Sequence, residues 1–305
     1  MEKALEIKNL VKTYKGGYTA VSDISFDVNK GDFFALLGPN GAGKSTTLGM
    51  VSSLVNKTSG QIKVFGHDIE TDYANAKKSL GVMSQEINLN IFETPINILI
   101  TQAGFFGIPK KESKSYAEEL LKKVELYDNK DTQVRFLSGG MKRRLMVIRA
   151  LIHKPKLLIL DEPTAGVDVE LRKSLWEMIS TCNQEGLTII LTTHYLEEAE
   201  SMCNRIVLIH KGKLHVNTDM KTFLKSADKQ TYVFDLKEDC NQDITLSSGA
   251  TKLIDAHTLE VEVERGVILN DIFSELTSKY SLEVLDVKSK AAKLEQLFID
   301  VARNK

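Results

Sequence analysis

Cysteine, tryptophan and long apolar runs are all scarce in this chain of 305 residues. There is one tryptophan, and the three cysteines, Cys182, Cys203 and Cys240, are odd in number and show no CxxC spacing. This argues against a disulfide framework and against a zinc site of the usual spacing. The chain is therefore expected to work in a reducing compartment.

The sequence also lacks a large charge excess and a membrane-spanning segment. The formal net charge is −1 and the sequence pI is near 6.6, which argues against a general nucleic-acid-binding surface. No apolar run approaches the roughly 18 residues that cross a bilayer, and the first residues, Met1–Glu6, lack the apolar core of a secretory signal. We expect a cytoplasmic protein with no membrane span of its own.

The sequence GPNGAGKST at 38–46 fits the phosphate-binding loop pattern, in which Gly38 and Gly43 precede Lys44 and Ser45. Such a loop turns its backbone N–H groups inward and opens onto a helix N-terminus, so it attracts phosphate. Lys44 would contact the phosphates and the Ser45 hydroxyl would bind Mg²⁺. The alternative is a glycine-rich turn without a ligand. The residues expected to bind nucleotide here are Gly38, Pro39, Asn40, Gly41, Ala42, Gly43, Lys44, Ser45 and Thr46.

Two acidic residues, Asp161 and Glu162, follow the apolar run Leu157–Leu160. Such a run predicts a strand buried on both faces, and open parallel sheets bind ligands at the carboxyl ends of their strands. Asp161 would help to hold Mg²⁺, and Glu162 would act on the attacking water. The alternative is an acidic pair on the surface.

With these two motifs and the LSGGM sequence at 137–141, the chain resembles the ATP-binding cassette (ABC) family over about its first three quarters. Ser138 is a good helix N-cap, and the amides of Gly139 and Gly140 would form a second anion site. The resemblance implies that Ser138, Gly139 and Gly140 cap the ATP held by a second copy of the chain. For an isolated SGG sequence, a simple capped helix would be the better interpretation.

The resemblance implies roles for four further residues. Tyr14 would stack on adenine, although a strand tyrosine is often a packing residue. Gln85 would contact Mg²⁺, and His194, after the apolar run 187–193, would hydrogen-bond the γ-phosphate. Asp168 ends the stretch 165–168, which would link the two sites of a dimer.

The predicted fold class is α/β: a P-loop NTPase cassette with a mostly parallel core sheet, an antiparallel β edge and a helical insertion. The cassette would span 1–220, with the insertion at about 90–150, starting at Thr94-Pro95. Phe105 and Phe106 would pack in the core or form a contact patch, with core packing favoured. A small C-terminal α+β domain would span 221–305, with strands at 231–236, 259–264 and 283–287. Two helical stripes are expected there, one from Ile268 to Tyr280 and one from Leu294 to Val301.

The resemblance is to ATPases of ABC-2-type exporters, which share the signature sequence, a C-terminal tail and a closing sequence like that at 294–298. It implies an ATP- and Mg²⁺-dependent hydrolase that forms homodimers and drives a separate integral membrane permease. The subunit would sit peripherally on the cytoplasmic face of the inner membrane, with no nucleic-acid partner. The alternatives are an importer ATPase, a soluble ABC ATPase with another macromolecular partner, and a regulatory subunit without hydrolysis. The sequence does not identify the cargo.

Overall fold

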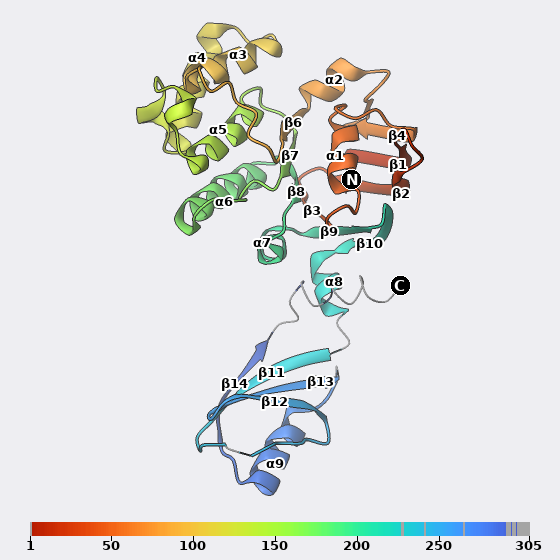
Figure 1. The fold of residues 1–305 in the computed structure, drawn as a ribbon, viewed down its shortest axis with the longest axis vertical. Coiled ribbons are helices and arrows are strands. Elements are labelled where there is room, and N and C mark those ends of the chain that lie inside the picture. Colours follow the sequence, from red (N-terminus) through yellow and green to blue (C-terminus); the bar gives the residue numbers. More distant parts are fainter. Residues whose placement is uncertain are drawn as a thin grey trace. The chain divides into compact units, whose positions relative to one another are not determined.

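The computed structural model describes residues 2–226, 229–240, 242–264, 266–290, 294 and 297 (Figure 1). The chain divides into two compact units, residues 1–219 and residues 220–305. None of the described helices is long and apolar enough to cross a membrane.

A six-stranded sheet forms the centre of the first unit, in the order β10-β9-β3-β8-β7-β6. Strands β9, β3, β8, β7 and β6 run parallel, and β10 pairs antiparallel with β9. The strands are β3 (Phe33–Leu37), β6 (Leu80–Met83), β7 (Leu157–Asp161), β8 (Thr188–Thr192), β9 (Arg205–His210) and β10 (Lys213–Asp219). All five residues of β3 and of β8 are buried, as expected for apolar strands covered on both faces.

A second, antiparallel sheet has the order β2-β1-β4-β5 and lies beside α1 (Figure 1). Its strands are β1 (Lys3–Thr13), β2 (Thr19–Asn29), β4 (Ser59–Val64) and β5 (His67–Asp68). Apolar side chains of both sheets and of α1 share one core, in which Phe26 stacks on Phe34 with ring centroids 5.7 Å apart. This core fixes the start of α1 against the end of β3.

Three helices pack together away from the antiparallel sheet (Figure 1). They are α3 (Pro95–Phe105), α4 (Lys110–Lys123) and α5 (Gly139–Leu151). The predicted helix start is confirmed, because the Thr94 side chain accepts a hydrogen bond from the Asn97 amide. Phe105 is 80% exposed, so the prediction that it packs in the core was wrong. Phe106 is half-buried and stacks on His153, with ring centroids 3.7 Å apart.

The remaining helices of the first unit connect or flank the strands. They are α1 (Lys44–Val51), α2 (Tyr73–Lys78), α6 (Val169–Gln184), α7 (Leu196–Met202) and the 3₁₀ turns η1 (Tyr127–Asn129) and η2 (Val134–Phe136). The unit is thus a mixed α/β structure with a parallel core sheet and an antiparallel edge, which confirms the predicted fold class.

The second unit contains an antiparallel sheet in the order β12-β13-β11-β14. Its elements are α8 (Met220–Lys225), β11 (Lys229–Leu236), β12 (Gly249–Asp255), β13 (Thr258–Glu264), α9 (Leu269–Tyr280) and β14 (Val284–Lys290). The three predicted strands are present, and β12 was not anticipated. Alternate residues of β13 pack into the core of this unit, as its period-two pattern predicts.

The C-terminal region departs from the sequence prediction at Ile268. Ile268 does not belong to the buried stripe of α9: it precedes the helix as its N-cap residue and is 63% exposed. The predicted last helix, 294–301, lies largely outside the described residues. Of it the structure describes Leu294 and Leu297, and both are buried.

Candidate functional site

The phosphate-binding loop joins β3 to α1, and its geometry depends on glycine. A Cβ atom on Gly38 would lie 2.2 Å from the Ile209 carbonyl oxygen, and one on Gly43 would lie 2.5 Å from the Ala20 carbonyl oxygen. Both contacts are with backbone, so neither position could accept a side chain without moving the core. Gly43 is also the N-cap residue of α1, which places the loop at a helix N-terminus.

Lys44 is buried in this loop at 7% exposure. Its Nζ donates hydrogen bonds to the carbonyl oxygens of Gly38 at 2.7 Å and Pro39 at 3.1 Å. Burial lowers the pKa of Lys44, and the nearby carboxylates of Glu162 and Asp161 act against this shift. A buried cation whose hydrogen bonds go to neutral carbonyl groups is well suited to bind an anion.

A pocket of about 400 Å³ opens over the loop, within the range of volumes found for small-molecule sites. It brings together predicted residues that lie far apart in the sequence. The lining residues are Tyr14, Tyr18, Ala20, Asn40, Gly41, Ala42, Gly43, Lys44, Ser45, Thr46, Gln85, Glu162 and His194.

Asp161 and Glu162 lie at the carboxyl end of β7, next to the end of β8. The Thr192 hydroxyl donates a short hydrogen bond to Asp161 Oδ1. The Glu162 amide donates to the Thr192 carbonyl at 3.0 Å, so the two strand ends are joined by backbone as well. Glu162 has a φ of 50°, an uncommon left-handed conformation for a residue with a long side chain. The chain therefore turns sharply at the residue expected to act on water.

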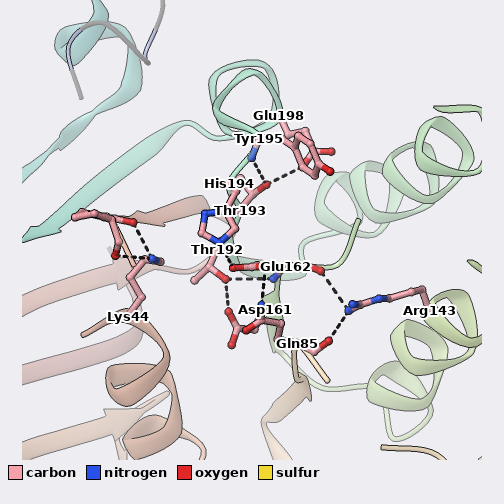
Figure 2. Close-up of polar contacts among 12 residues, drawn as sticks. Lys44, Gln85, Arg143, Asp161, Glu162, Thr192, Thr193, His194, Tyr195 and Glu198 are labelled. Carbon is pink, nitrogen blue, oxygen red and sulfur yellow. Dashed lines mark hydrogen bonds and ion pairs between the residues drawn. The ribbon is translucent and has the colours of Figure 1, made fainter. Parts of the chain in front are cut away.

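Both carboxylate oxygens of Glu162 have partners among the predicted residues (Figure 2). His194 Nε2 lies 2.5 Å from Oε1, and Gln85 Nε2 donates to Oε2 at 2.8 Å. Arg143 on α5 adds a link that was not anticipated, because its Nη1 donates to the carbonyl oxygens of Gln85 at 2.7 Å and of Glu162 at 3.4 Å. Three loops from separate parts of the sequence thus meet at Glu162.

The residues of the LSGGM sequence at 137–141 lie outside this pocket. Ser138 caps α5, as predicted, and its hydroxyl oxygen accepts a hydrogen bond from the Met141 amide at 3.2 Å. None of the described residues that line the pocket over the phosphate loop belongs to 138–140. Within one chain, the structure therefore does not bring Ser138, Gly139 and Gly140 to the site formed by Lys44 and Glu162.

The comparisons with known proteins agree with this geometry. The family model described as "ABC transporter" matches residues 21–165. The chain is 35% identical to the linearmycin resistance ATP-binding protein LnrL of Bacillus subtilis (strain 168), over 97% of each chain. The chain belongs to the ABC transporter ATP-binding family. This ABC chain is also 40% identical to the Nod factor export ATP-binding protein I of Cupriavidus metallidurans, over 70% of each protein.

Solved structures support the same assignment. An ATP-binding subunit of an ABC transporter matches with a TM-score of 0.68 and 27% identity, over 73% of this ABC chain and 92% of that chain. A dimeric post-hydrolysis state of the cassette MJ0796 bound to ADP and Pi matches with a TM-score of 0.65 and 25% identity, over 71% and 98%. The chain is thus an ABC-type ATPase that binds and hydrolyses ATP.

The donor groups of the pocket fit Mg²⁺ bound together with ATP. Among the residues that the structure describes, no three histidine, cysteine or carboxylate side chains come together as a metal site. Magnesium does not require such a group, because it prefers oxygen ligands and usually combines one or two protein groups with phosphate and water. Ser45 and Gln85 in the pocket, with Asp161 at the adjoining strand end, supply oxygen atoms of that kind.

Sequence reasoning missed several residues of this site. Tyr18 and Ala20 line the pocket beside Tyr14, and the Tyr14 amide bonds to the Tyr18 carbonyl at 2.9 Å across the β1–β2 turn. The signal that could have indicated Tyr18 is the pairing of the two strands that flank the turn, because this pairing places Tyr18 opposite Tyr14. No local signal indicates Arg143, whose contacts depend on how α5 packs.

Proposed function

We propose that this chain is the ATP-hydrolysing subunit of an ABC-2-type exporter and drives a separate integral membrane permease from the cytoplasmic face of the inner membrane. The observation that carries the proposal is the likeness to the linearmycin resistance ATP-binding protein over 97% of both chains. The Nod factor export proteins support the same direction of transport. A finer likeness, of the whole chain to the bacterial YadG-type subunit, belongs to the proposal.

The proposal includes a dimer in which each site has residues from two chains. Lys44, Ser45 and the loop amides of one copy would hold the phosphates, with Tyr14 against the adenine. Ser138, Gly139 and Gly140 of the other copy would cap the γ-phosphate with helix N-terminal amides. This is supported by the pocket, which contains the first set and lacks the second.

The chemistry of hydrolysis follows from the groups around Glu162. Bound Mg²⁺, held by Ser45, Gln85 and Asp161, would neutralise phosphate charge. Glu162 would accept a hydrogen bond from the attacking water and orient it. His194 and Gln85, which bind the Glu162 carboxylate in this structure, would turn their donors to the phosphate and leave Glu162 for water.

The domain assignment is part of the same proposal. Residues 1–220 would form the cassette, and the insertion at about 90–150 would pass the change at the nucleotide to the permease. Arg143 provides a direct path, since it joins α5 to the backbone of Gln85 and Glu162. Residues 221–305 would form an accessory domain that braces the dimer or regulates it.

A purification test distinguishes an ATPase that works with a membrane permease from a soluble ABC ATPase with another macromolecular partner. The tagged full-length chain is expressed with the products of its neighbouring genes and purified in detergent. We expect it to carry a polytopic membrane protein and to show ATPase activity in that complex. Recovery with ribosomes or nucleic acid and without any membrane protein would contradict the exporter assignment.

A further inference from the structure

Behind the catalytic loop lies a buried carboxylate, Glu198, in the first turn of α7, at 8% exposure. It accepts hydrogen bonds from the Thr164 hydroxyl, at 2.9 Å to Oε1 and 3.0 Å to Oε2. It also accepts one from the Thr193 hydroxyl at 2.9 Å (Figure 2). Thr164 is two residues after Glu162, and Thr193 directly precedes His194. One carboxylate thus holds the segments on both sides of the site.

Two side chains of α6 complete the surroundings of Glu198. Trp176 Nε1 donates to Oε1 at 3.1 Å, and Arg172 Nε lies 3.6 Å from the same oxygen. Arg172 also reaches both segments, because its Nη2 donates to the Val167 carbonyl at 3.3 Å and its guanidinium lies 4.3 Å from the centre of the Tyr195 ring. Val167 adjoins Asp168, and Tyr195 adjoins His194.

An ionised carboxylate accepts hydrogen bonds on both oxygens and donates none, so it favours a complete shell of donors. When it is buried, the loss of one donor is costly, because water cannot replace it. If the segment at 164–168 moved without the segment at 193–195, Glu198 would lose one of its threonine partners. The structure therefore favours movement of both segments together, with α6 as the support.

We propose that Glu198 is a positioning residue that couples the segment at 164–168 to His194. The inference rests on the proposed function, in which His194 faces the γ-phosphate, and on the family resemblance, which implies that 165–168 links the two sites of a dimer. A phosphate bound at His194 would change the position of His194, and Glu198 would pass this change to the segment at 164–168, next to the partner chain. The two sites of the dimer would then influence each other.

Trp176 offers a direct probe, because it is the only tryptophan in the sequence and bonds to Glu198. In a Glu162→Gln background, which we expect to retain bound ATP, addition of Mg·ATP should change the emission of Trp176. Adding Glu198→Gln should abolish most of this response. A fluorescent ATP analogue measures Kd separately, and we expect it to stay within about twofold, since Glu198 does not line the pocket.

Steady-state kinetics test the positioning role. Glu198→Gln keeps the shape of the side chain and removes its charge, and we expect kcat to fall by about 10- to 100-fold with little change in KM. The Hill coefficient for ATP should fall toward 1. The matched control is Glu177→Gln, an exposed glutamate of α6 next to Trp176, which should behave as wild type.

Two milder variants keep the test valid if Glu198→Gln does not fold. Thr164→Val and Thr193→Val each remove one hydroxyl with little change in shape. If Glu198 joins the two segments, the loss of kcat in the double variant should be clearly different from the product of the single losses. Effects on kcat that simply multiply would overturn the coupling.

The outcomes separate this inference from the proposed function. The coupling would be wrong if folded Glu198→Gln matched Glu177→Gln in kcat, in the Hill coefficient and in the Trp176 response. The proposed function would still stand in that case, provided that the wild type hydrolysed ATP and formed dimers. If the wild type bound ATP without dimer formation, measured by analytical ultracentrifugation, the dimer proposal itself would fail.

Discussion

Glu162 and His194 lie in contact, with 2.5 Å between Oε1 and Nε2, although 31 other residues separate them in the sequence. Because a carboxylate only accepts hydrogen bonds, Nε2 of His194 carries the shared proton. Gln85 holds the other oxygen at 2.8 Å. Gln85 and His194 are therefore both bonded to Glu162, and a γ-phosphate would compete with Glu162 for the same two donors.

Glu162→Gln should stop hydrolysis and retain ATP binding. The amide keeps the shape of the side chain but is a poor acceptor for the proton of the attacking water, so we expect kcat to fall by about 10²- to 10⁴-fold. ATPase assays and equilibrium binding of a fluorescent ATP analogue measure the two effects. Glu177→Gln serves as the control for loss of one surface charge. Hydrolysis at the wild-type rate by Glu162→Gln would exclude Glu162 as the base.

The lowered pKa of Lys44 predicts a specific dependence of stability on pH. The folded chain binds this proton less tightly than the unfolded chain does, because the ammonium is buried. The contribution of Lys44 to the free energy of unfolding should therefore increase as the pH rises from its lowered pKa toward 10.5, the value for an ordinary lysine. Urea unfolding of wild type and Lys44→Met at several pH values below 10.5 measures this difference.

We expect the free energy of unfolding of the wild type, minus that of Lys44→Met, to increase across this pH range. A difference that stayed constant or decreased would contradict the burial argument. Phosphate should relieve the cost of the buried charge, so ATP should raise the Tm of the wild type and leave that of Lys44→Met unchanged.

The two tyrosines at the β1–β2 turn should contribute to nucleotide affinity. Tyr14 is 40% exposed and Tyr18 is 62% exposed, and both line the pocket. Stacking of a base on an aromatic ring contributes about 1–3 kcal/mol, so Tyr14→Ala should raise the Kd for ATP by roughly 5- to 150-fold. Isothermal titration calorimetry checks this, with Tyr14→Phe expected to bind normally.

Tyr73→Ala is a matched control for Tyr14→Ala. Tyr73 is likewise exposed and lies under a lysine ammonium, but it does not line the pocket. If Tyr18→Ala weakened ATP binding and Tyr14→Ala did not, Tyr18 would take the stacking role that the sequence assigned to its neighbour.

The parts of the fold that could be predicted are those with a strong local signal. The apolar run before Asp161 predicted a buried strand, because no polar position interrupts it. The alternation in β13 predicted a strand with one buried face. By contrast, β12 carries Leu253 and Ile254 in succession, both exposed, so its sequence shows no such pattern.

The contacts that could not be predicted depend on tertiary placement. Arg143 is one of several cations along α5, and only the packing of that helix brings it to the carbonyls of Gln85 and Glu162. Glu198 stands among other glutamates in the sequence 195–200, yet its side chain is the one bound by Thr164, Thr193 and Trp176. The left-handed backbone conformation of Glu162 also could not be predicted from the sequence. Glycine is the residue that usually marks this conformation, and here the position is a glutamate.

If each ATP site is formed by Lys44 of one chain and Ser138 of another, two inactive variants should restore activity to each other when they are mixed. Lys44→Ala removes one half of the site, and Ser138→Arg blocks the other half. In a mixed dimer, the chain with intact Lys44 meets the chain with intact Ser138 at one of the two sites. Each variant alone should be inactive, and an equal mixture should regain activity. Half of the dimers are mixed and each has one complete site, so the recovery should be at most about a quarter of wild-type ATPase activity, and less where the two sites are coupled. The shared site would be contradicted if folded variants that exchange subunits regained no activity at any mixing ratio. It would also be contradicted if a wild-type chain that stays monomeric with ATP and magnesium were fully active.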